Sequence, residues 1–367
     1  MRNGKKRERK VSDIMKAIVK TTRDHGVEVK DVEIPKLKKD EVLVKVEAVS
    51  ICGSDLHMFE GMNAYEWVPT PVILGHEFTG IVVEVNNRDH EHLLNSHVII
   101  NPYVACGECK NCQMGRTNLC DHGQGAMDKV PAKSLQYGFR QNGGMAEYAA
   151  IYYKNVLPIP ETMPIEVAGM VEALGIGVRA LERANILPGD TAVVIGPGPI
   201  GLSLVASLSN FALKKLIVTG LTVDEERLQM AKELGATDII YADKVNDLDA
   251  ISELTDGEGV DHVFETSGFH QSMVSGVRMC TKGGELLLVG ISAKETILPS
   301  NEIVRGEITV KGVYGVTEQT LKRTIAMAAS GKYPYKKLIS HILPLKDAVE
   351  GLEVGVKKQG IKVILKP

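Results

Sequence analysis

Four cysteines near the end of the first third of the sequence have spacings that suit a bound metal ion. They are Cys106, Cys109, Cys112 and Cys120, separated by two, two and seven residues. Such spacings are typical of a tetrahedral thiolate zinc site, and four protein ligands leave no position for a substrate. Gly107, Asn111 and Gly115 would provide the turns that wrap the chain around one ion. We therefore expect a structural zinc here.

Two other interpretations of these cysteines are open. An iron–sulfur cluster also uses four thiolates. A nucleic-acid zinc finger would need a basic recognition helix nearby, and the flanking Asp121, Gly123 and Asp128 do not provide one. Six cysteines in a chain of 367 residues, four of them so closely spaced, indicate metal-bound thiols in a reducing compartment.

A second candidate metal site is scattered along the chain: Cys52, His76, Glu77 and Glu172. A thiolate, an imidazole and a carboxylate suit zinc, and three protein ligands plus water leave room for a substrate oxygen. Taken singly, Cys52 could be a small buried apolar residue and His76 a core histidine with ordinary hydrogen bonds. Cys280 is interpreted as such a buried cysteine. The trio His90, Glu91 and His92 is interpreted as a solvated loop.

A glycine-rich loop follows the apolar run that ends at Ile195. Its sequence is Gly196-Pro197-Gly198-Pro199-Ile200-Gly201, and a helical stretch, 202–209, comes next. Between a buried strand and a helix, this pattern predicts a dinucleotide site. The first glycine permits the tight turn, the second lets the backbone approach the pyrophosphate, and the third lets the helix pack on the sheet. The N-terminus of the helix would face the phosphates.

The acid that usually binds the adenosine ribose is missing. It is expected at the end of the second strand, where this chain has Gly220, followed by Asp224 and Arg227. Loss of that carboxylate removes the repulsion against a 2′-phosphate, whereas Asp224 could reach the ribose from the loop. The sequence therefore leaves NAD and NADP both open.

The overall pattern predicts an α/β protein of two domains. Short strand-like runs dominate 15–165, strands alternate with helices from about 167, and the pattern is mixed again after 306. Residues 1–14 are rich in Lys and Arg and are expected to form a disordered extension, although a basic arm could bind polyanions. A net charge of −3 and the lack of long apolar runs argue against nucleic-acid or membrane partners, and no signal peptide follows the arm, so we expect a cytoplasmic protein.

The segment Cys52-Gly53-Ser54-Asp55-Leu56-His57, the run Gly75-His76-Glu77, the cysteine lobe and the glycine-rich loop occur in the order of the zinc-containing medium-chain dehydrogenases. From Met15 to Pro367 the chain resembles this family, and most closely its sorbitol and 2,3-butanediol dehydrogenase branch. The resemblance implies a GroES-like β-rich catalytic domain (15–166 and 307–367) and a doubly wound Rossmann domain (167–306). The active site would lie in the cleft between them.

The resemblance also assigns roles. Cys52, His76 and Glu77 match the catalytic zinc ligands, Glu172 a glutamate that binds or exchanges on that metal, and the four lobe cysteines the structural zinc. Ser54 and His57 match a proton relay, and Ile200, Gly220 and Arg227 match cofactor contacts. Asp55 would either orient His76 or cap the local turn. The expected cofactors are two zinc ions and NAD or NADP, and the expected assembly is a homodimer or homotetramer.

The implied reaction is hydride transfer between a secondary alcohol or polyol hydroxyl and the nicotinamide. Two departures from the branch concern its substrate and its cofactor: Gly220 replaces the ribose-binding acid, and an arginine that holds the substrate near Gly315 is absent. L-threonine 3-dehydrogenase activity is the alternative within the enzyme class. A non-catalytic binding protein on the same fold is the alternative outside it.

Overall fold

The computed structural model describes residues 14–62, 65–122, 135–292 and 294–367. Most of the predicted basic extension, 1–13, lies outside the described residues. Ile14 already belongs to the first strand, one residue earlier than the predicted start of the folded part. Among the helices of the described residues, none has the length and apolar character needed to cross a bilayer.

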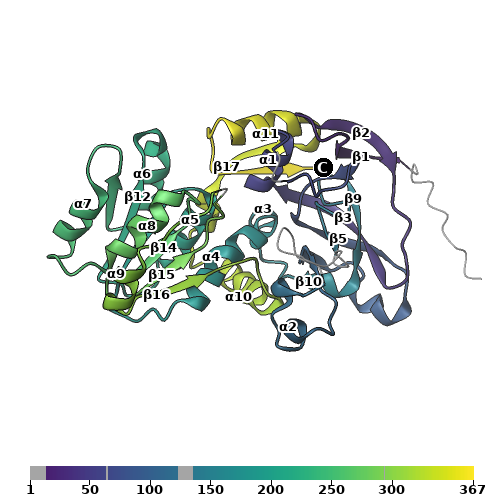
Figure 1. Cartoon of the computed structure of the whole chain (residues 1–367). Coiled ribbons are helices and arrows are strands. Elements are labelled where there is room, and N and C mark those ends of the chain that lie inside the picture. Colours follow the sequence, from purple (N-terminus) through teal and green to yellow (C-terminus); the bar gives the residue numbers. More distant parts are fainter. Residues whose placement is uncertain (1–13, 63–64, 123–134, 293) are drawn as a thin grey trace, which may run out of the picture.

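One half of the molecule is rich in β-structure (Figure 1). Its main sheet has the strand order β10-β6-β5-β3-β18-β17, with β9 paired to β3, and smaller sheets join β2-β1-β4 and β7-β8. The strands are β1 (Ile14–Lys20), β2 (Glu28–Glu33), β3 (Glu41–Ser50), β4 (Val72–Ile73), β5 (Glu77–Val85), β6 (His97–Ile100), β7 (Tyr103–Val104), β8 (Leu135–Gln136), β9 (Tyr148–Tyr152), β10 (Val156–Pro158), β17 (Ile339–Pro344) and β18 (Lys362–Lys366).

Short helices cover the edges of this half. They are α1 (Gly53–Phe59), η2 (Arg88–Leu93), α2 (Lys110–Gln113), η3 (Thr117–Leu119), η5 (Tyr153–Asn155), η7 (Tyr335–Leu338), η8 (Leu345–Asp347) and α11 (Ala348–Val356). The expected return of the chain is present, since β18 lies antiparallel to β3 and pairs Ile364 with Ser50. The last strand of the chain is therefore next to the strand that leads to Cys52.

The other half is a parallel sheet of order β13-β12-β11-β14-β15-β16. Its strands are β11 (Thr191–Ile195), β12 (Lys215–Gly220), β13 (Asp238–Tyr241), β14 (Val260–Glu265), β15 (Cys280–Leu288) and β16 (Thr309–Gly312). Its helices are α5 (Pro199–Leu208), η6 (Thr222–Asp224), α6 (Glu225–Glu233), α7 (Asp247–Leu254), α8 (His270–Met279) and α9 (Ser300–Gly306). All five residues of β11 are buried, as expected for a central parallel strand with both faces covered.

The parallel sheet extends beyond the predicted limit at residue 306. Strand β16 begins at Thr309 and pairs with β15, so it belongs to this sheet. Its residues are half-buried or exposed. An edge strand of this kind lacks the apolar run by which strands are recognised in a sequence. The domain limits themselves remain predictions.

Helices α3 (Ile165–Ala168), α4 (Val171–Arg183) and α10 (Glu318–Ala329) lie between the two halves in Figure 1. One buried cluster contains Ala48 and Ile99 of the β-rich half, Leu174 of α4, and Val194 and Leu204 of the parallel-sheet half. The apolar core is therefore continuous through α4. This helix carries Glu172 in its first turn.

Candidate active site

Three of the four residues of the scattered metal site come together. The potential ligand atoms of Cys52, His76 and Glu77 all lie within 4.8 Å of one another. Glu77 is the first residue of β5 and pairs with Ser50 at the end of β3, two residues before Cys52. Two adjacent strands thus deliver all three side chains to one edge of the sheet.

Asp55 links the two segments that carry these side chains. One carboxylate oxygen accepts a hydrogen bond from the backbone N–H of Cys52 at 2.9 Å, and the other accepts one from Gly75 at 3.3 Å. Asp55 was predicted either to orient His76 or to cap the local turn. In the structure it caps backbone N–H groups. His76 Nδ1 is buried and has no hydrogen-bond partner in the described part of the chain.

Gly75 is required at its position by its backbone and its surroundings. Its φ of 87° is in the left-handed region, which glycine adopts far more readily than other residues. A Cβ atom there would also lie 2.7 Å from the side chain of Met145 and 2.9 Å from that of Val49. The glycine therefore allows the turn that places His76 beside Cys52.

A lysine that the sequence analysis missed enters this cluster from the C-terminal strand. Lys362 Nζ lies 2.6 Å from Glu77 Oε2, and both side chains are almost fully buried. Burial opposes ionisation of both groups, but their attraction keeps the pKa of Glu77 below its usual value and that of Lys362 above it. The sequence did contain a sign of this pair, because Lys362 lies within the apolar run 361–365. A lysine is rarely buried without a partner of opposite charge, so a buried carboxylate could have been expected beside it.

The other charges of the cluster shift two further groups. Burial disfavours the charged form of His76, yet the negative charges of Cys52, Asp55 and Glu172 raise its pKa to about 10. Burial also raises the pKa of Glu172, to about 7; the charge of His76 opposes this shift and that of Glu77 adds to it. Glu172 is buried beside the group but is not among the three residues with converging ligand atoms.

The donor set and its unsatisfied atoms fit a divalent metal ion. A thiolate, an imidazole and a carboxylate are the side chains that zinc prefers, and three of them leave a coordination position for a substrate oxygen. Glu77 Oε1 is buried and has no hydrogen-bond partner in the described residues. An unpaired buried carboxylate oxygen is unfavourable unless a cation faces it. The residues present can therefore hold the ion.

Helix α1 places Ser54 and His57 on one face, three residues apart. Ser54 is half-buried and its Oγ makes no hydrogen bond to the described residues, whereas His57 is exposed. The imidazole of His57 lies beside Tyr65, with ring centroids 5.8 Å apart. The two predicted relay residues thus lead from the interior towards solvent.

An aromatic wall flanks the cluster. The ring of Phe139 lies 4.9 Å from that of His76 and stacks on Trp67 at 5.7 Å, between centroids. The Arg140 guanidinium lies 4.8 Å from the centre of the Trp67 ring. Aromatic residues distant in the sequence carry no metal-ligand signal, so the sequence analysis did not identify this wall.

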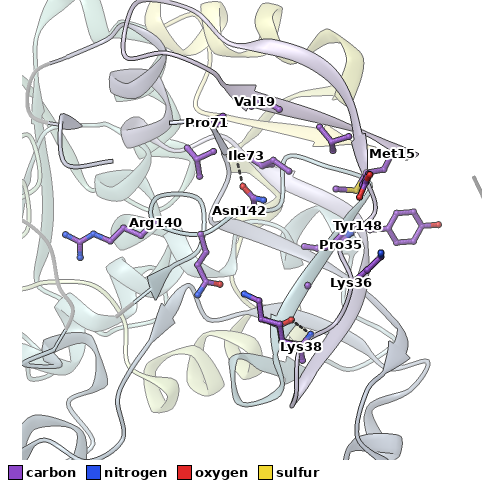
Figure 2. A pocket seen from close by; sticks show the side chains of 18 of the residues that line it. Met15, Val19, Pro35, Lys36, Lys38, Pro71, Ile73, Arg140, Asn142 and Tyr148 are labelled. Carbon is purple, nitrogen blue, oxygen red and sulfur yellow. Dashed lines mark hydrogen bonds between the residues drawn. The ribbon is translucent and has the colours of Figure 1, made fainter. Parts of the chain in front are cut away.

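The same half of the molecule has a cavity of about 600 Å³. Figure 2 shows its lining residues from close by. Met15 and Val19 of β1, Ile73 of β4, Tyr148 of β9 and Arg140 contribute to its lining. Its lining contains none of the residues predicted to bind metal or cofactor. The cavity therefore does not include the cluster around Cys52.

Gly315 is packed against Tyr103. Its φ is 56°, and a Cβ atom would lie 2.8 Å from the Tyr103 hydroxyl and 3.4 Å from the Cβ of Asn118. Asn118 Nδ2 donates a hydrogen bond to the carbonyl of Tyr314. A side chain at position 315 itself would therefore collide with Tyr103.

The four lobe cysteines also converge. Their sulfur atoms lie within 4.8 Å of one another. Backbone N–H groups donate to three of the sulfurs: Cys109 to Cys106 at 3.4 Å, Cys112 to Cys109 at 3.5 Å, and Cys106 to Cys120 at 3.4 Å. Burial opposes ionisation of Cys106, but its hydrogen bonds lower the pKa of this thiol to about 7. Four converging sulfur atoms of this kind fit one tetrahedral ion.

The remaining candidate residues form no further separate metal site within the described part of the chain. Cys106, Glu108 and His122 also lie close together, but they share Cys106 with the lobe. The expectation that His90, Glu91 and His92 are all solvated is wrong for His90. This residue is buried, stacks on Tyr153 at 3.7 Å between centroids, and lies 3.2 Å from Asp40. Cys280 is half-buried.

The glycine-rich loop has the geometry that its sequence predicts. Gly196 has a φ of 99°. Gly198 precedes the first residue of α5, and a Cβ there would meet nothing within 4 Å, so its backbone is open to a ligand. A Cβ at Gly201 would lie 2.1 Å from the Gly196 carbonyl oxygen, so only glycine allows this close packing. Ile200 lies in the first turn of α5.

The predicted ribose contacts have other partners in this structure. Asp224 accepts a hydrogen bond from the backbone N–H of Leu221 at 3.3 Å. Arg227 Nη2 donates to the carbonyl oxygen of Gly360 at 2.6 Å, and Nη1 lies 3.9 Å from Asp224. A Cβ at Gly220 would lie 2.8 Å from the Pro197 ring. The Pro197 ring thus fills the space in which a ribose-binding acid would start.

Two family models match the chain. The alcohol dehydrogenase GroES-like domain matches residues 38–161, and the zinc-binding dehydrogenase domain matches residues 199–330. An L-threonine 3-dehydrogenase of Bacillus velezensis is 34% identical over 359 residues, which cover 96% of this chain and 99% of the relative. A sorbitol dehydrogenase of Bacillus subtilis is 32% identical over 356 residues, covering 96% of each protein.

A solved structure extends the comparison to three dimensions. A zinc-binding dehydrogenase of Sinorhizobium meliloti, solved with NADP bound, superposes with a TM-score of 0.87 at 27% identity and covers 96% of this chain and 99% of its own. The predicted fold class and the predicted family are both confirmed. The chain belongs to the zinc-binding medium-chain alcohol dehydrogenase family and is an NAD(P)-dependent dehydrogenase.

Proposed function

We propose that this dehydrogenase oxidises a neutral secondary alcohol or polyol to the ketone, at a zinc ion held by Cys52, His76 and Glu77. The convergence of these three ligand atoms within 4.8 Å is the observation that carries the proposal. When bound, the zinc supplies Lewis-acid stabilisation of negative charge on the substrate oxygen. Glu172 is the further carboxylate that we assign to this site. The four lobe cysteines hold the structural zinc.

Ser54 and His57 carry the hydroxyl proton away from the site in this proposal. Ser54 Oγ has no hydrogen-bond partner among the described residues and can accept a hydrogen bond from the substrate hydroxyl. His57, on the same face of α1, is exposed to solvent. Imidazole is suited to proton transfer near neutral pH. The aromatic wall of Trp67 and Phe139 restricts water on the other side of His76.

A neutral substrate is favoured by the surroundings of Gly315. The groups packed around it, Tyr103, Tyr314 and Asn118, are uncharged at neutral pH, and Asn118 Oδ1 is buried without a hydrogen-bond partner in the described residues. That oxygen can accept a hydrogen bond from a second hydroxyl of a diol or polyol. L-threonine, the substrate of the first relative, would bring a carboxylate that these groups do not neutralise.

We assign the glycine loop, 196–201, to the pyrophosphate of NAD or NADP. The open backbone at Gly198 supports this assignment, as does the N-terminus of α5, which no side chain of the described residues caps. Arg227 is engaged by Gly360 and Asp224, so it has to leave both partners before it can bind a 2′-phosphate. The structure favours neither cofactor through these residues.

The first test compares substrates and one ligand variant. We expect oxidation of vicinal diols and polyols to exceed oxidation of L-threonine with either cofactor, measured as kcat/KM.

Cys52→Ser should lose at least about 100-fold in activity and one zinc ion per chain while remaining folded, because a hydroxyl is a poorer zinc ligand than a thiolate. Cys280→Ser, outside both cysteine sites, is the matched control and should keep both ions and the activity. Full activity of Cys52→Ser, or a clear preference for L-threonine, would contradict the proposal.

The relay is tested by pH dependence. We expect His57→Ala to slow turnover near pH 7 by about 10- to 100-fold, and less near pH 10, where hydroxide can accept the proton in place of the imidazole. The measurement is the profile of kcat against pH, with His92→Ala, an exposed histidine of η2, as the control. An equal loss at every pH would rule out a proton-transfer role for His57.

The steric role of Pro197 gives a prediction about the cofactor. Gly220→Asp alone should lower the free energy of unfolding by about 1–3 kcal/mol, as expected for overpacking, and should not strengthen NAD binding. The pair Gly220→Asp with Pro197→Ala should recover stability and bind NAD more tightly, because the carboxylate then has room to reach the ribose. Thermal unfolding and cofactor titration measure both effects. Tighter NAD binding by the single variant, with unchanged stability, would refute this steric argument.

We also propose that the chain forms a homo-oligomer through the edge strand β16. The segment connecting β15 to β16 exposes Ile291, Ile297 and Val304, with exposed fractions of 81%, 93% and 75%. An open strand edge beside exposed apolar residues is typical of an interface. Val304→Asp should shift the sedimentation equilibrium towards monomer, whereas Leu187→Asp, at an exposed leucine elsewhere, should not. A wild-type monomer at micromolar concentration would refute the proposal.

A further inference from the structure

The cluster around Cys52 contains a buried cation to which the proposed reaction assigns no role. Lys362 is 3% exposed and Glu77 is 1% exposed, and their side-chain atoms Nζ and Oε2 are 2.6 Å apart. Lys362 Nζ also donates to the carbonyl oxygen of Ile51 at 3.0 Å. The ammonium group thus connects the residue before Cys52 with the carboxylate of Glu77.

The position of Lys362 follows from three adjacent strands. Strand β18 pairs with β3, and β3 pairs with β5, so that Ser50 is opposite both Ile364 and Glu77. At the other side, the carbonyl of Gly360, two residues before Lys362, accepts the hydrogen bond from Arg227. The segment that carries Lys362 is therefore held by backbone pairing on one side and by an arginine on the other.

The pair leaves the two oxygens of Glu77 in different environments. Oε2 is bound by the ammonium group, whereas Oε1 is buried and makes no hydrogen bond to any described residue. We propose that Lys362 is a positioning residue that holds Oε2 and so presents Oε1 alone to the metal ion. This inference rests on the proposed function, because it requires Glu77 to be a ligand of the catalytic zinc.

The same strand contains a pair for comparison. Lys366 lies 2.6 Å from Glu166, but these side chains are 41% and 25% exposed and lie away from the three converging ligands. An exposed pair contributes little to stability. Removing one partner of a buried pair leaves an uncompensated charge in the interior. The two lysines therefore differ in environment while sharing a strand, a partner type and a distance.

The test measures retention of zinc by the two sites. Four proteins are loaded with zinc and then exposed to a chelating dye: the wild type, Lys362→Met, Lys362→Arg and the control Lys366→Met. The fast and slow phases of zinc transfer to the dye report the two bound ions. We expect Lys362→Met to bind the catalytic ion about 10- to 100-fold more weakly, the usual effect of losing a group that holds a metal ligand. The lobe ion should be unaffected. Lys362→Arg should recover most of the affinity, and Lys366→Met should match the wild type.

A double variant covers the case in which Lys362→Met fails to fold. Lys362→Met with Glu77→Gln removes the uncompensated charge, so it should regain thermal stability. Because Glu77→Gln by itself already removes the ligand carboxylate, the double variant should retain the catalytic ion as Glu77→Gln alone does if Lys362 acts through Glu77. A further loss of zinc when Lys362→Met is added to Glu77→Gln, or equal retention by Lys362→Met and Lys366→Met, would overturn the inference.

The wild-type measurement separates this inference from the proposed function. A wild-type chain that binds only the lobe ion would refute the proposed catalytic site itself, and with it the role of Lys362. Two ions in the wild type, with normal retention in Lys362→Met, would refute the positioning role alone. Cobalt substitution gives an independent readout, because the visible spectrum of Co²⁺ at the catalytic site should change in Lys362→Met and remain unchanged in Lys366→Met.

Discussion

Burial of several negative groups at one edge of the β-rich sheet is the constraint on which this structure depends. Asp55, Glu77 and Glu172 are all buried beside the thiol of Cys52. A buried charge is unfavourable unless it is paired or hydrogen-bonded. Asp55 receives two backbone N–H groups, and Glu77 receives the ammonium group of Lys362. The unpaired Oε1 of Glu77 and the raised pKa of Glu172 leave the cluster with an excess of acceptors, which suits a bound cation.

The order of the elements along the chain follows from this constraint. The ligands on β3 and β5 need a partner cation, and the chain supplies it only after the parallel-sheet half is complete, when β18 returns to β3. Glu172 arrives on α4, whose apolar residues belong to the core shared by both halves. The insertion of the parallel-sheet half into the β-rich half therefore serves the metal site as well as packing. The chain passes between the halves at α4 and at β18, and each of these segments brings a charged side chain, Glu172 or Lys362, to the cluster around Cys52.

The sequence predicted the parts of the site that depend on short spacings. The cysteine lobe, the glycine loop and the order of the two halves each have a local pattern, and the structure forms all three. Lys362 was missed because its partner is 285 residues away, and no spacing relates them. Strand β16 was missed because an edge strand lacks a continuous apolar run. Asp55 was left undecided because a carboxylate suits both roles, a cap for the local backbone and a hydrogen-bond acceptor for His76.

The two departures from the expected branch pattern have a common physical form. At Gly220 the missing acid corresponds to space taken by the ring of Pro197, and in the run where the arginine is missing, Gly315 packs against Tyr103. In each case a side chain from another segment fills the volume beside the glycine, so a larger residue at that glycine alone would overpack the site. A single substitution is therefore the wrong unit for comparing this chain with its relatives. A carboxylate at position 220 needs a smaller residue at 197 as well, so the pair 197 with 220, rather than position 220 alone, is the unit to compare for cofactor binding.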